Sequence, residues 1–296
     1  VMRRLLRRIL LTGAPPPEGS KGSAFILLRL EVLMALGDFD AGLKLLNSVP
    51  RENREGLFRR LETEMLIATG KADEACATVA NEATQIEELF WQKALIFCEM
   101  MAGKMVRAEL GVSLLEENET IDKTFVALAR GILDDQPKLP EALQKLDVLN
   151  LAMLKLAKLQ VPLELARNFP AALIGITSDS TALKHLDALE IAAEEGLLGD
   201  DELRKRYLAA LPASLSVGNF GNSANESSER AKLFLEAVDT QIPMAKAEAL
   251  ERAMKSARKA GRFGGVSRLF RPVISTLVPE NDLLWVAPLA FRASLL

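Results

Sequence analysis

The sequence is poor in the residue types that most active sites and metal centres use. Its 296 residues include a single histidine, His185, and two cysteines, Cys76 and Cys98. Every Ser-His-Asp or Cys-His arrangement would therefore have to use His185. Neither cysteine has a second Cys or His within a few positions, as zinc sites usually require. We therefore expect a protein that is not an enzyme, with no catalytic residues, no metal and no cofactor.

The two cysteines also bear on the redox state of the chain. Two thiols in a chain of this length do not make a disulfide framework, and both lie in apolar helical patterns. The sequence therefore predicts buried, reduced cysteines. The compartment stays open, with the cytoplasm favoured and the periplasm as the alternative if a signal peptide has been removed. Because the chain begins with Val1 instead of methionine, we expect it to be a piece cut from a longer protein.

Aromatic residues, alternating strand patterns and long apolar runs are scarce as well. Aromatics make up 5% of the residues, while 49% are hydrophobic, a composition dominated by Ala and Leu that favours helix over sheet. No uninterrupted apolar run reaches the roughly eighteen residues that a membrane-spanning helix needs. The net charge of −3 argues against a chain that coats nucleic acid, since phosphate binding needs a basic footprint.

The sequence does contain glycines that recur at a fixed interval, each at the end of a helical pattern. Gly37, Gly70 and Gly103 are separated by 33 residues both times. Each follows an amphipathic helical pattern, as expected for a left-handed residue that ends a helix. A second helical pattern follows, with a small residue five positions after each glycine: Gly42, Ala75 and Ala108. This predicts three antiparallel helical hairpins whose helices approach closely.

One such hairpin cannot cover its own apolar faces, so hairpins of this kind stack in arrays. The stretch Gly37-Asp38-Phe39, and Gly70-Lys71 with Ala75, resemble the turn of the tetratricopeptide-repeat superfamily, which reads roughly Gly-Asp-Tyr-x-x-Ala. The resemblance covers about residues 20–135, in degenerate form. It implies an all-α fold, a right-handed α-solenoid of antiparallel hairpins, with a C-terminal helical bundle or a continuation of the array.

The same resemblance implies a concave groove lined by the first helix of each hairpin. The inward positions, ten and six residues before each turn glycine, include the residues that we expect to bind a partner: Glu31, Arg60, Glu64, Lys93 and Phe97. Such a groove suits a peptide held by charge-assisted hydrogen bonds and one apolar anchor. The alternative is an internal ladder of salt bridges between neighbouring repeats.

The chain divides into five predicted segments. Residues 1–19 form an N-terminal amphipathic helix and a proline-rich loop, residues 20–135 the repeats, and residues 136–211 further helical hairpins. Residues 212–228, rich in Gly, Asn and Ser, predict a flexible loop or linker. Residues 229–296 form a C-terminal helical region.

Two basic clusters raise the question of an anionic partner. The N-terminal helix carries arginines at positions 3, 4, 7 and 8, which suits a membrane surface or an acidic partner, although a helix covering the end of an array is the favoured interpretation. The second cluster is a stripe at helical spacing: Arg252, Lys255, Lys259 and Arg262. It suits phosphate or nucleic acid, but a solvated helix face is favoured in an acidic chain.

The leading hypothesis is therefore a non-enzymatic interaction or scaffold module that binds a protein or peptide through a helical-repeat surface. Self-association through exposed end hairpins is part of this expectation. One alternative is the helical scaffold region of a larger enzyme, such as a cell-wall lytic transglycosylase. Another is a nucleic-acid-associated helical protein that uses the basic stripe.

Overall fold

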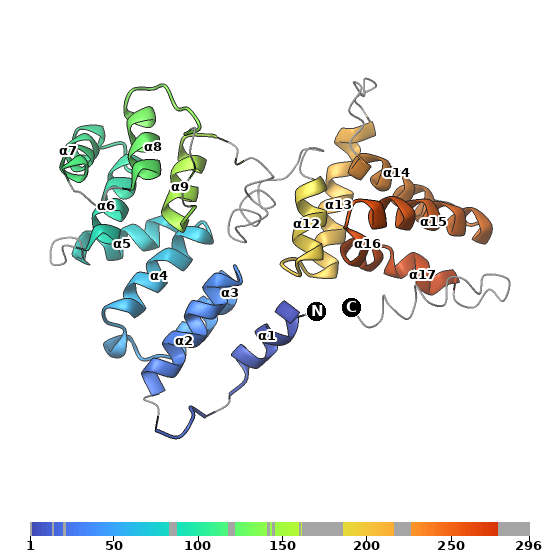
Figure 1. Ribbon diagram of the computed structural model, residues 1–296, viewed down its shortest axis with the longest axis horizontal. Coiled ribbons are helices and arrows are strands. Elements are labelled where there is room, and N and C mark those ends of the chain that lie inside the picture. Colours follow the sequence, from blue (N-terminus) through green and yellow to red (C-terminus); the bar gives the residue numbers. More distant parts are fainter. Residues whose placement is uncertain are drawn as a thin grey trace. The chain divides into compact units, whose positions relative to one another are not determined.

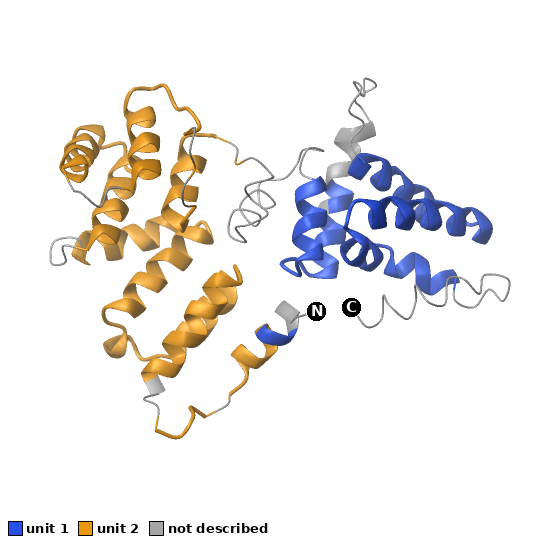
Figure 2. Cartoon of the chain, in the orientation of Figure 1, with its two compact units in different colours: residues 1–6, 176–296 blue, residues 7–175 orange. Residues whose placement is uncertain are grey.

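A computed structural model describes residues 2–13, 15–19, 22–82, 88–117, 122–140, 143, 146–159, 161, 186–215 and 226–277 (Figure 1). Every regular element in these ranges is a helix, which confirms the all-α class. The chain forms two compact units (Figure 2): unit 2 spans residues 7–175, and unit 1 comprises residues 176–296 together with residues 1–6. Each unit has a hydrophobic core of its own.

The N-terminal half of the chain holds the helices predicted as repeats, preceded by the predicted N-terminal helix and followed by one helix of the next predicted segment. In chain order they are α1 (Met2–Leu11), α2 (Gly22–Ala35), α3 (Phe39–Leu46), the short 3-10 turn η1 (Arg51–Asn53), α4 (Leu57–Ala68), α5 (Ala72–Glu82), α6 (Leu89–Met101), α7 (Met105–Glu116), α8 (Lys123–Leu133) and α9 (Val148–Leu156). The helices from α2 to α8 each contact the next helix along the chain.

The three turn glycines end helices as the sequence predicts. Their φ angles are 74°, 81° and 71° for Gly37, Gly70 and Gly103, in the left-handed region that costs glycine little. The amide of the residue after each glycine donates to a carbonyl in the last turn of the preceding helix, at 2.8 to 2.9 Å. Each glycine is thus the hinge between two helices, α2 and α3, α4 and α5, or α6 and α7.

The small residues after the hinges lie where the helices meet. Ala75 and Ala108 are completely buried. A Cβ atom at Gly42 would lie 2.3 Å from Sδ of Met65 in α4. Gly42 therefore leaves room for Met65 of the next hairpin, whereas the sequence predicts that it lets the two helices of its own hairpin approach.

Helix α9 folds back onto the hairpin helices. It contacts α4, α6 and α8, and its residues Leu149, Met153 and Leu154 share one core with them. Within unit 2, α7 lies on the other side of α6 from α9 (Figure 1). No break in the core therefore falls at the predicted segment boundary after residue 135 in the described part of unit 2.

The two cysteines form a disulfide, so the prediction of reduced thiols is wrong. Cys76 on α5 is bonded to Cys98 on α6, with their Cα atoms 5.5 Å apart. Because α5 packs against α6, the second helix of one hairpin brings its cysteine to the first helix of the next. The sequence shows a separation of 22 residues but not this contact between neighbouring hairpins.

Unit 1 is built from α12 (Leu186–Glu194), α13 (Asp200–Leu215), α14 (Glu226–Asp239), α15 (Pro243–Lys259), α16 (Phe263–Leu269) and α17 (Arg271–Leu277). Its core includes the edge-to-face ring pairs Tyr207 with Phe234 and Phe234 with Phe270. Both ends of the predicted loop at 212–228 are helical, because α13 continues to Leu215 and α14 begins at Glu226.

Candidate functional site

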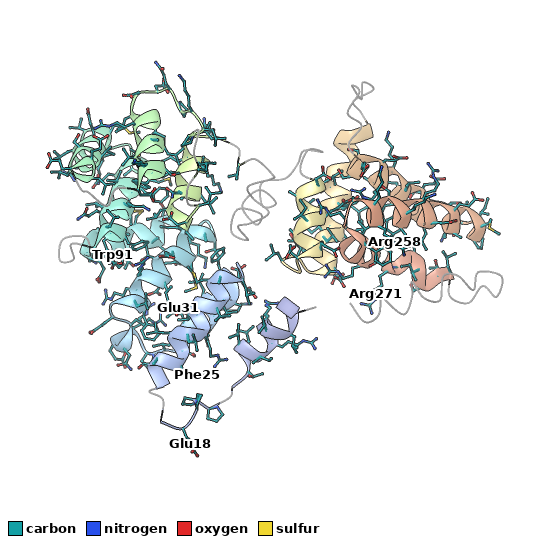
Figure 3. All side chains as sticks on the ribbon, in the orientation of Figure 1. Glu18, Phe25, Glu31, Trp91, Arg258 and Arg271 are labelled. Carbon is teal, nitrogen blue, oxygen red and sulfur yellow. A yellow bond between two sulfur atoms is a disulfide. The ribbon has the colours of Figure 1, made fainter. Side chains whose placement is uncertain are left out.

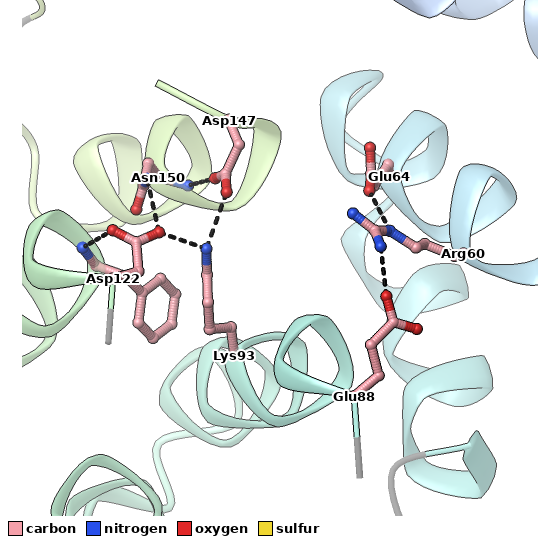
Figure 4. A network of polar contacts seen from close by, with 8 residues as sticks. Arg60, Glu64, Glu88, Lys93, Asp122, Asp147 and Asn150 are labelled. Atoms are coloured by element: carbon pink, nitrogen blue, oxygen red, sulfur yellow. Dashed lines mark hydrogen bonds and ion pairs between the residues drawn. The ribbon is translucent and has the colours of Figure 1, made fainter. Parts of the chain in front are cut away.

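A buried lysine joins three helices of unit 2. Lys93 on α6 is 5% exposed, and its Nζ atom lies 2.6 Å from Oδ2 of Asp122 and 2.8 Å from Oδ2 of Asp147 (Figure 4). These aspartates are the N-cap residues of α8 and α9. Their Oδ1 atoms accept the backbone N–H groups of Phe125, at 3.1 Å, and Asn150, at 2.8 Å. Each aspartate thus uses one oxygen to cap its helix and the other to bind Lys93.

An aromatic ring and a side-chain amide surround the buried ion pairs of Lys93. The Nζ atom lies 5.2 Å from the ring centroid of Phe125, and the Asn150 side-chain amide donates to Oδ2 of Asp122 at 3.2 Å. Burial alone would raise the pKa of Asp122. The hydrogen bonds from Lys93 and from the backbone of Phe125 outweigh it and lower that pKa below its ordinary value.

A second polar cluster joins α4 to the start of α6. Nε of Arg60 donates to Oε1 of Glu64 at 3.0 Å, and its NH1 group donates to Glu88 (Figure 4). The guanidinium also lies over the ring of Phe90, 4.9 Å from its centroid. Burial raises the pKa of Glu64, and the negative charge of Asp147 raises it further, against the opposing effects of Arg60 and Lys93.

The structure thus brings three of the five expected groove residues into internal ion pairs. Arg60, Glu64 and Lys93 all bind groups of the chain itself, on the helices that α9 contacts. Phe97 is 3% exposed within the core, while Glu31 is exposed on α2 (Figure 3). The arrangement holds the N-termini of α8 and α9 against α6 and shows the geometry of an internal ladder.

Sequence reasoning missed the carboxylates that complete this network. Asp122 and Asp147 each stand directly before a helical pattern, which is a readable N-cap signal. Their shared lysine lies 29 and 54 residues away. No local pattern shows that two caps so distant in sequence meet at one side chain.

Unit 1 contains a charge pair that is buried on both sides. Arg230 on α14 and Glu190 on α12 are each 1% exposed and are joined at 3.0 and 2.5 Å. The Tyr207 hydroxyl donates to Glu190 at 2.9 Å, and Arg230 donates to Ser256 at 2.9 Å. Burial raises the pKa of Glu190, with Arg230 opposing it. His185 lies outside the described residues.

The basic stripe faces carboxylates of the neighbouring helix. Arg252, Lys255 and Lys259 are exposed on α15, and Arg262 is partly buried. Arg252 lies 3.9 Å from Glu229, and Lys259 lies 3.6 Å from Glu226, both on α14. All four of these paired side chains are more than half exposed, so the contacts are weak. They nevertheless reduce the positive potential of the stripe.

The N-terminal helix is tied down by its polar groups. Arg7 pairs with Asp38 at the turn after α2, and Arg29 on α2 donates to the carbonyls of Leu10 and Thr12. The two bonds from Arg29 satisfy backbone carbonyls at the C-terminal end of α1. The arginine side chains at positions 3 and 4 lie outside the described set.

Helix α7 carries a row of exposed apolar side chains. Val106, Leu110 and Leu114 are 82%, 63% and 61% exposed, and their spacing of four places them along one face. The same register in the earlier hairpins is also exposed but is polar or alanine: Asp40, Lys44 and Ser48 in the first, and Asp73, Ala77 and Asn81 in the second. Only the third hairpin therefore presents an apolar row at this register.

Comparisons of the chain with protein families, with characterised proteins and with solved structures find no match. Among the described residues, no group of three or more His, Cys, Asp or Glu side chains is arranged to hold a metal ion. In the same part of the chain, no helix combines the length and the apolar character needed to cross a membrane.

Proposed function

We propose that this chain is a non-enzymatic interaction module built on a right-handed solenoid of tetratricopeptide-like hairpins, and that it binds a protein partner through a repeat surface. The observation that carries the proposal is the exposed row of Val106, Leu110 and Leu114 on α7. Full burial of one such side chain contributes about 1.5–3 kcal/mol. A contiguous row that stays exposed is a common mark of a binding surface.

The outer face of α7 suits a partner better than the groove does. A peptide in the groove would compete with α9, which already contacts α4 and α6. It would also have to replace the ion pairs of Arg60 and Lys93, leaving carboxylates without their partners. The α7 row needs no such displacement, because its side chains are already open to solvent.

The rigid support of α7 strengthens the case. Its opposite face is fixed by the buried residues Ala108, Val112 and Leu115. The bidentate pair between Arg130 on α8 and Glu116, at 3.0 and 2.6 Å, holds its C-terminal end. A preorganised helix loses little conformational entropy when it binds.

The test is affinity capture from the source cell with three baits. These are the wild type, Leu110→Lys on the apolar row, and Ala77→Lys at the same register of α5. We expect some captured proteins to be retained by wild type and by Ala77→Lys and to be lost with Leu110→Lys. Further copies of this chain count among the captured proteins. Equal retention by all three baits would remove α7 as the binding surface.

A second candidate function is favoured by the disulfide between Cys76 and Cys98. Structural disulfides persist in oxidising compartments. This fits the helical scaffold region of a larger enzyme outside the cytoplasm, such as a cell-wall lytic transglycosylase. Trapping free thiols in intact cells tests it: an oxidised pair supports this location, and a fully reduced pair argues for the cytoplasm.

A further inference from the structure

We propose that the partner of the α7 row is the α7 row of a second copy of this chain, packed antiparallel about a two-fold axis at Leu110. The inference deepens the proposed function and rests on α7 being a docking surface. Three features of α7 support the pairing: the apolar row is self-complementary, the charges beside it are self-complementary, and the row is peculiar to one hairpin.

The apolar row is symmetric about its central residue. Val106 and Leu114 lie four residues before and after Leu110, and four residues turn a helix by only about 40° beyond a full turn. In an antiparallel copy, Leu110 therefore meets Leu110 of the other chain, and Val106 meets its Leu114. A two-fold interface requires this kind of self-complementarity.

The charges around the row change sign along the helix. Lys104 and Arg107, at the start of α7, lie 3.5 and 3.9 Å from the Glu99 carboxylate on α6, and their side chains are still 52% and 72% exposed. Glu117, directly after the helix, is exposed as well. An antiparallel copy places its Glu117 about four residues along the helix axis from Arg107, roughly 6 Å, a span that the two long side chains bridge. A parallel copy would instead place like charges together, so the charges favour the antiparallel pair.

One acidic side chain lies beside the proposed axis. Glu109 is exposed, and a second copy would bring another Glu109 onto the same side. The Arg130 guanidinium lies close enough to Glu109 for that charge to help raise the arginine pKa. This positive charge offsets the repulsion between the two glutamates.

The apolar row is not a general feature of the hairpins, because the equivalent positions on α5 are not apolar in the same way. Asp73 and Ala77 occupy on α5 the positions that Val106 and Leu110 occupy on α7, and all four are exposed. If an apolar outer face served only the stacking of hairpins, the earlier ones would need it too. The change from polar to apolar at the third hairpin is explained by a contact made there alone.

The size of the row sets the strength of the association. One pair of helices buries less than the roughly 1,200 Å² that marks the lower end of stable interfaces. We therefore expect a weak dimer in equilibrium with monomer. Its population rises with protein concentration through the micromolar to sub-millimolar range.

Sedimentation equilibrium of the full chain over that range is the first test. Wild type is expected to shift from monomer to dimer. Leu110→Glu is expected to weaken dimerisation at least ~10-fold, because it buries two unpaired charges at the axis, while the matched surface variant Ala77→Glu leaves it unchanged. Circular dichroism confirms that both variants are folded. A wild type that stays monomeric throughout overturns the dimer.

Cross-linking and charge-reversal variants test the geometry of the pair. Leu110→Cys is expected to form a disulfide-linked dimer on mild oxidation, and Ala77→Cys to remain monomeric. Arg107→Glu and Glu117→Arg are each expected to weaken dimerisation about fivefold, and the double variant to restore it. Dimerisation that is unchanged in the charge variants would contradict the antiparallel pair. Equal cross-linking through positions 77 and 110 would contradict it as well.

The outcomes distinguish this inference from the function on which it rests. If wild type is monomeric but Leu110→Lys still loses captured proteins that Ala77→Lys retains, α7 binds a different protein and only the dimer is refuted. If neither dimerisation nor capture depends on Leu110, both proposals fail.

Discussion

The ammonium group of Lys93 lies 2.6 Å from the Asp122 carboxylate, although the two residues are 29 positions apart and Lys93 is almost fully buried. A buried cation is stable only when it is paired. Here the pair also orders the start of α8, because Asp122 caps that helix. The ion pair with Lys93 on α6 therefore also fixes the start of α8. The second ion pair, with Asp147, does the same for α9.

The first prediction concerns the loss of this cation. Lys93→Met retains most of the side-chain volume but leaves Asp122 and Asp147 without their shared partner. We expect the free energy of unfolding of unit 2 to fall by about 3 kcal/mol. Urea unfolding followed by Trp91 fluorescence measures it, in a Trp285→Phe background in which Trp91 is the sole tryptophan.

The matched control is Lys104→Met, which removes a lysine that is half exposed at its side chain. Its effect should stay within about 0.5 kcal/mol. Equal effects at positions 93 and 104 would show that the buried network contributes nothing particular to stability.

The second prediction is a dependence of stability on pH. The pKa of Asp122 is lowered in the folded protein from its ordinary value of 3.8, so the folded state binds this proton less readily than the unfolded chain does. Its contribution to stability is therefore fully present above pH ~4 and is lost as pH falls through the folded pKa. Asp122→Asn retains a capping oxygen but does not titrate.

Urea unfolding at a series of pH values, from neutral to about pH 2.5, compares the wild type with Asp122→Asn. The wild type should be more stable near neutrality, and the difference should shrink as the solution becomes acidic. A difference that stays constant across this range would exclude Asp122 as the titrating group.

The third prediction concerns the disulfide that joins α5 to α6. Cross-linking residues 22 positions apart reduces the entropy of the unfolded chain, and the loop-length relation gives about 3 kcal/mol of stabilisation. The purified protein should show no free thiol when denatured without reductant. Reductant should lower the urea midpoint of the wild type and leave that of a Cys76→Ala, Cys98→Ala double variant unchanged. A titration that finds two free thiols in protein purified without reductant would contradict the bond.

The parts of the fold that depend on neighbours in sequence could be predicted from the sequence. Gly37, Gly70 and Gly103 end helices because glycine alone enters the left-handed region without cost, and this property needs no tertiary information. The burial of Ala75 and Ala108 follows from the same register. Repetition at a fixed interval made both features visible.

The features that depend on distant contacts could not be predicted in the same way. Cys76 meets Cys98 only because consecutive hairpins pack side by side, and Asp147 meets Lys93 only because α9 returns to α6. The partners in unit 1, Glu190 and Arg230, are 40 residues apart. The apolar row on α7, by contrast, was readable from the repeat register, because residues 33 positions apart in the three hairpins differ in polarity at equivalent positions.

The last prediction uses a close approach of two helices in unit 1. A Cβ atom at Gly265 in α16 would lie 2.9 Å from the backbone nitrogen of Glu194 and 3.0 Å from the carbonyl oxygen of Glu190, both in α12. Backbone atoms cannot move aside as a flexible side chain can. Gly265→Ala should therefore separate the helices and weaken the bond from the Gly265 N–H to the Glu194 carboxylate, now 2.6 Å long.

Overpacking of this kind costs about 1–3 kcal/mol, against a gain of about 0.5–1 kcal/mol from replacing a helical glycine by alanine. The net result should be a loss of about 1–2 kcal/mol, measured as faster amide hydrogen exchange in α12 and α16. Gly199→Ala is the matched control, because a Cβ atom there meets nothing within 4 Å. Unchanged exchange in Gly265→Ala would contradict this prediction. It would mean that α16 can shift away from α12 without a loss of stability, and that the core around Phe270 does not depend on the close packing of these two helices.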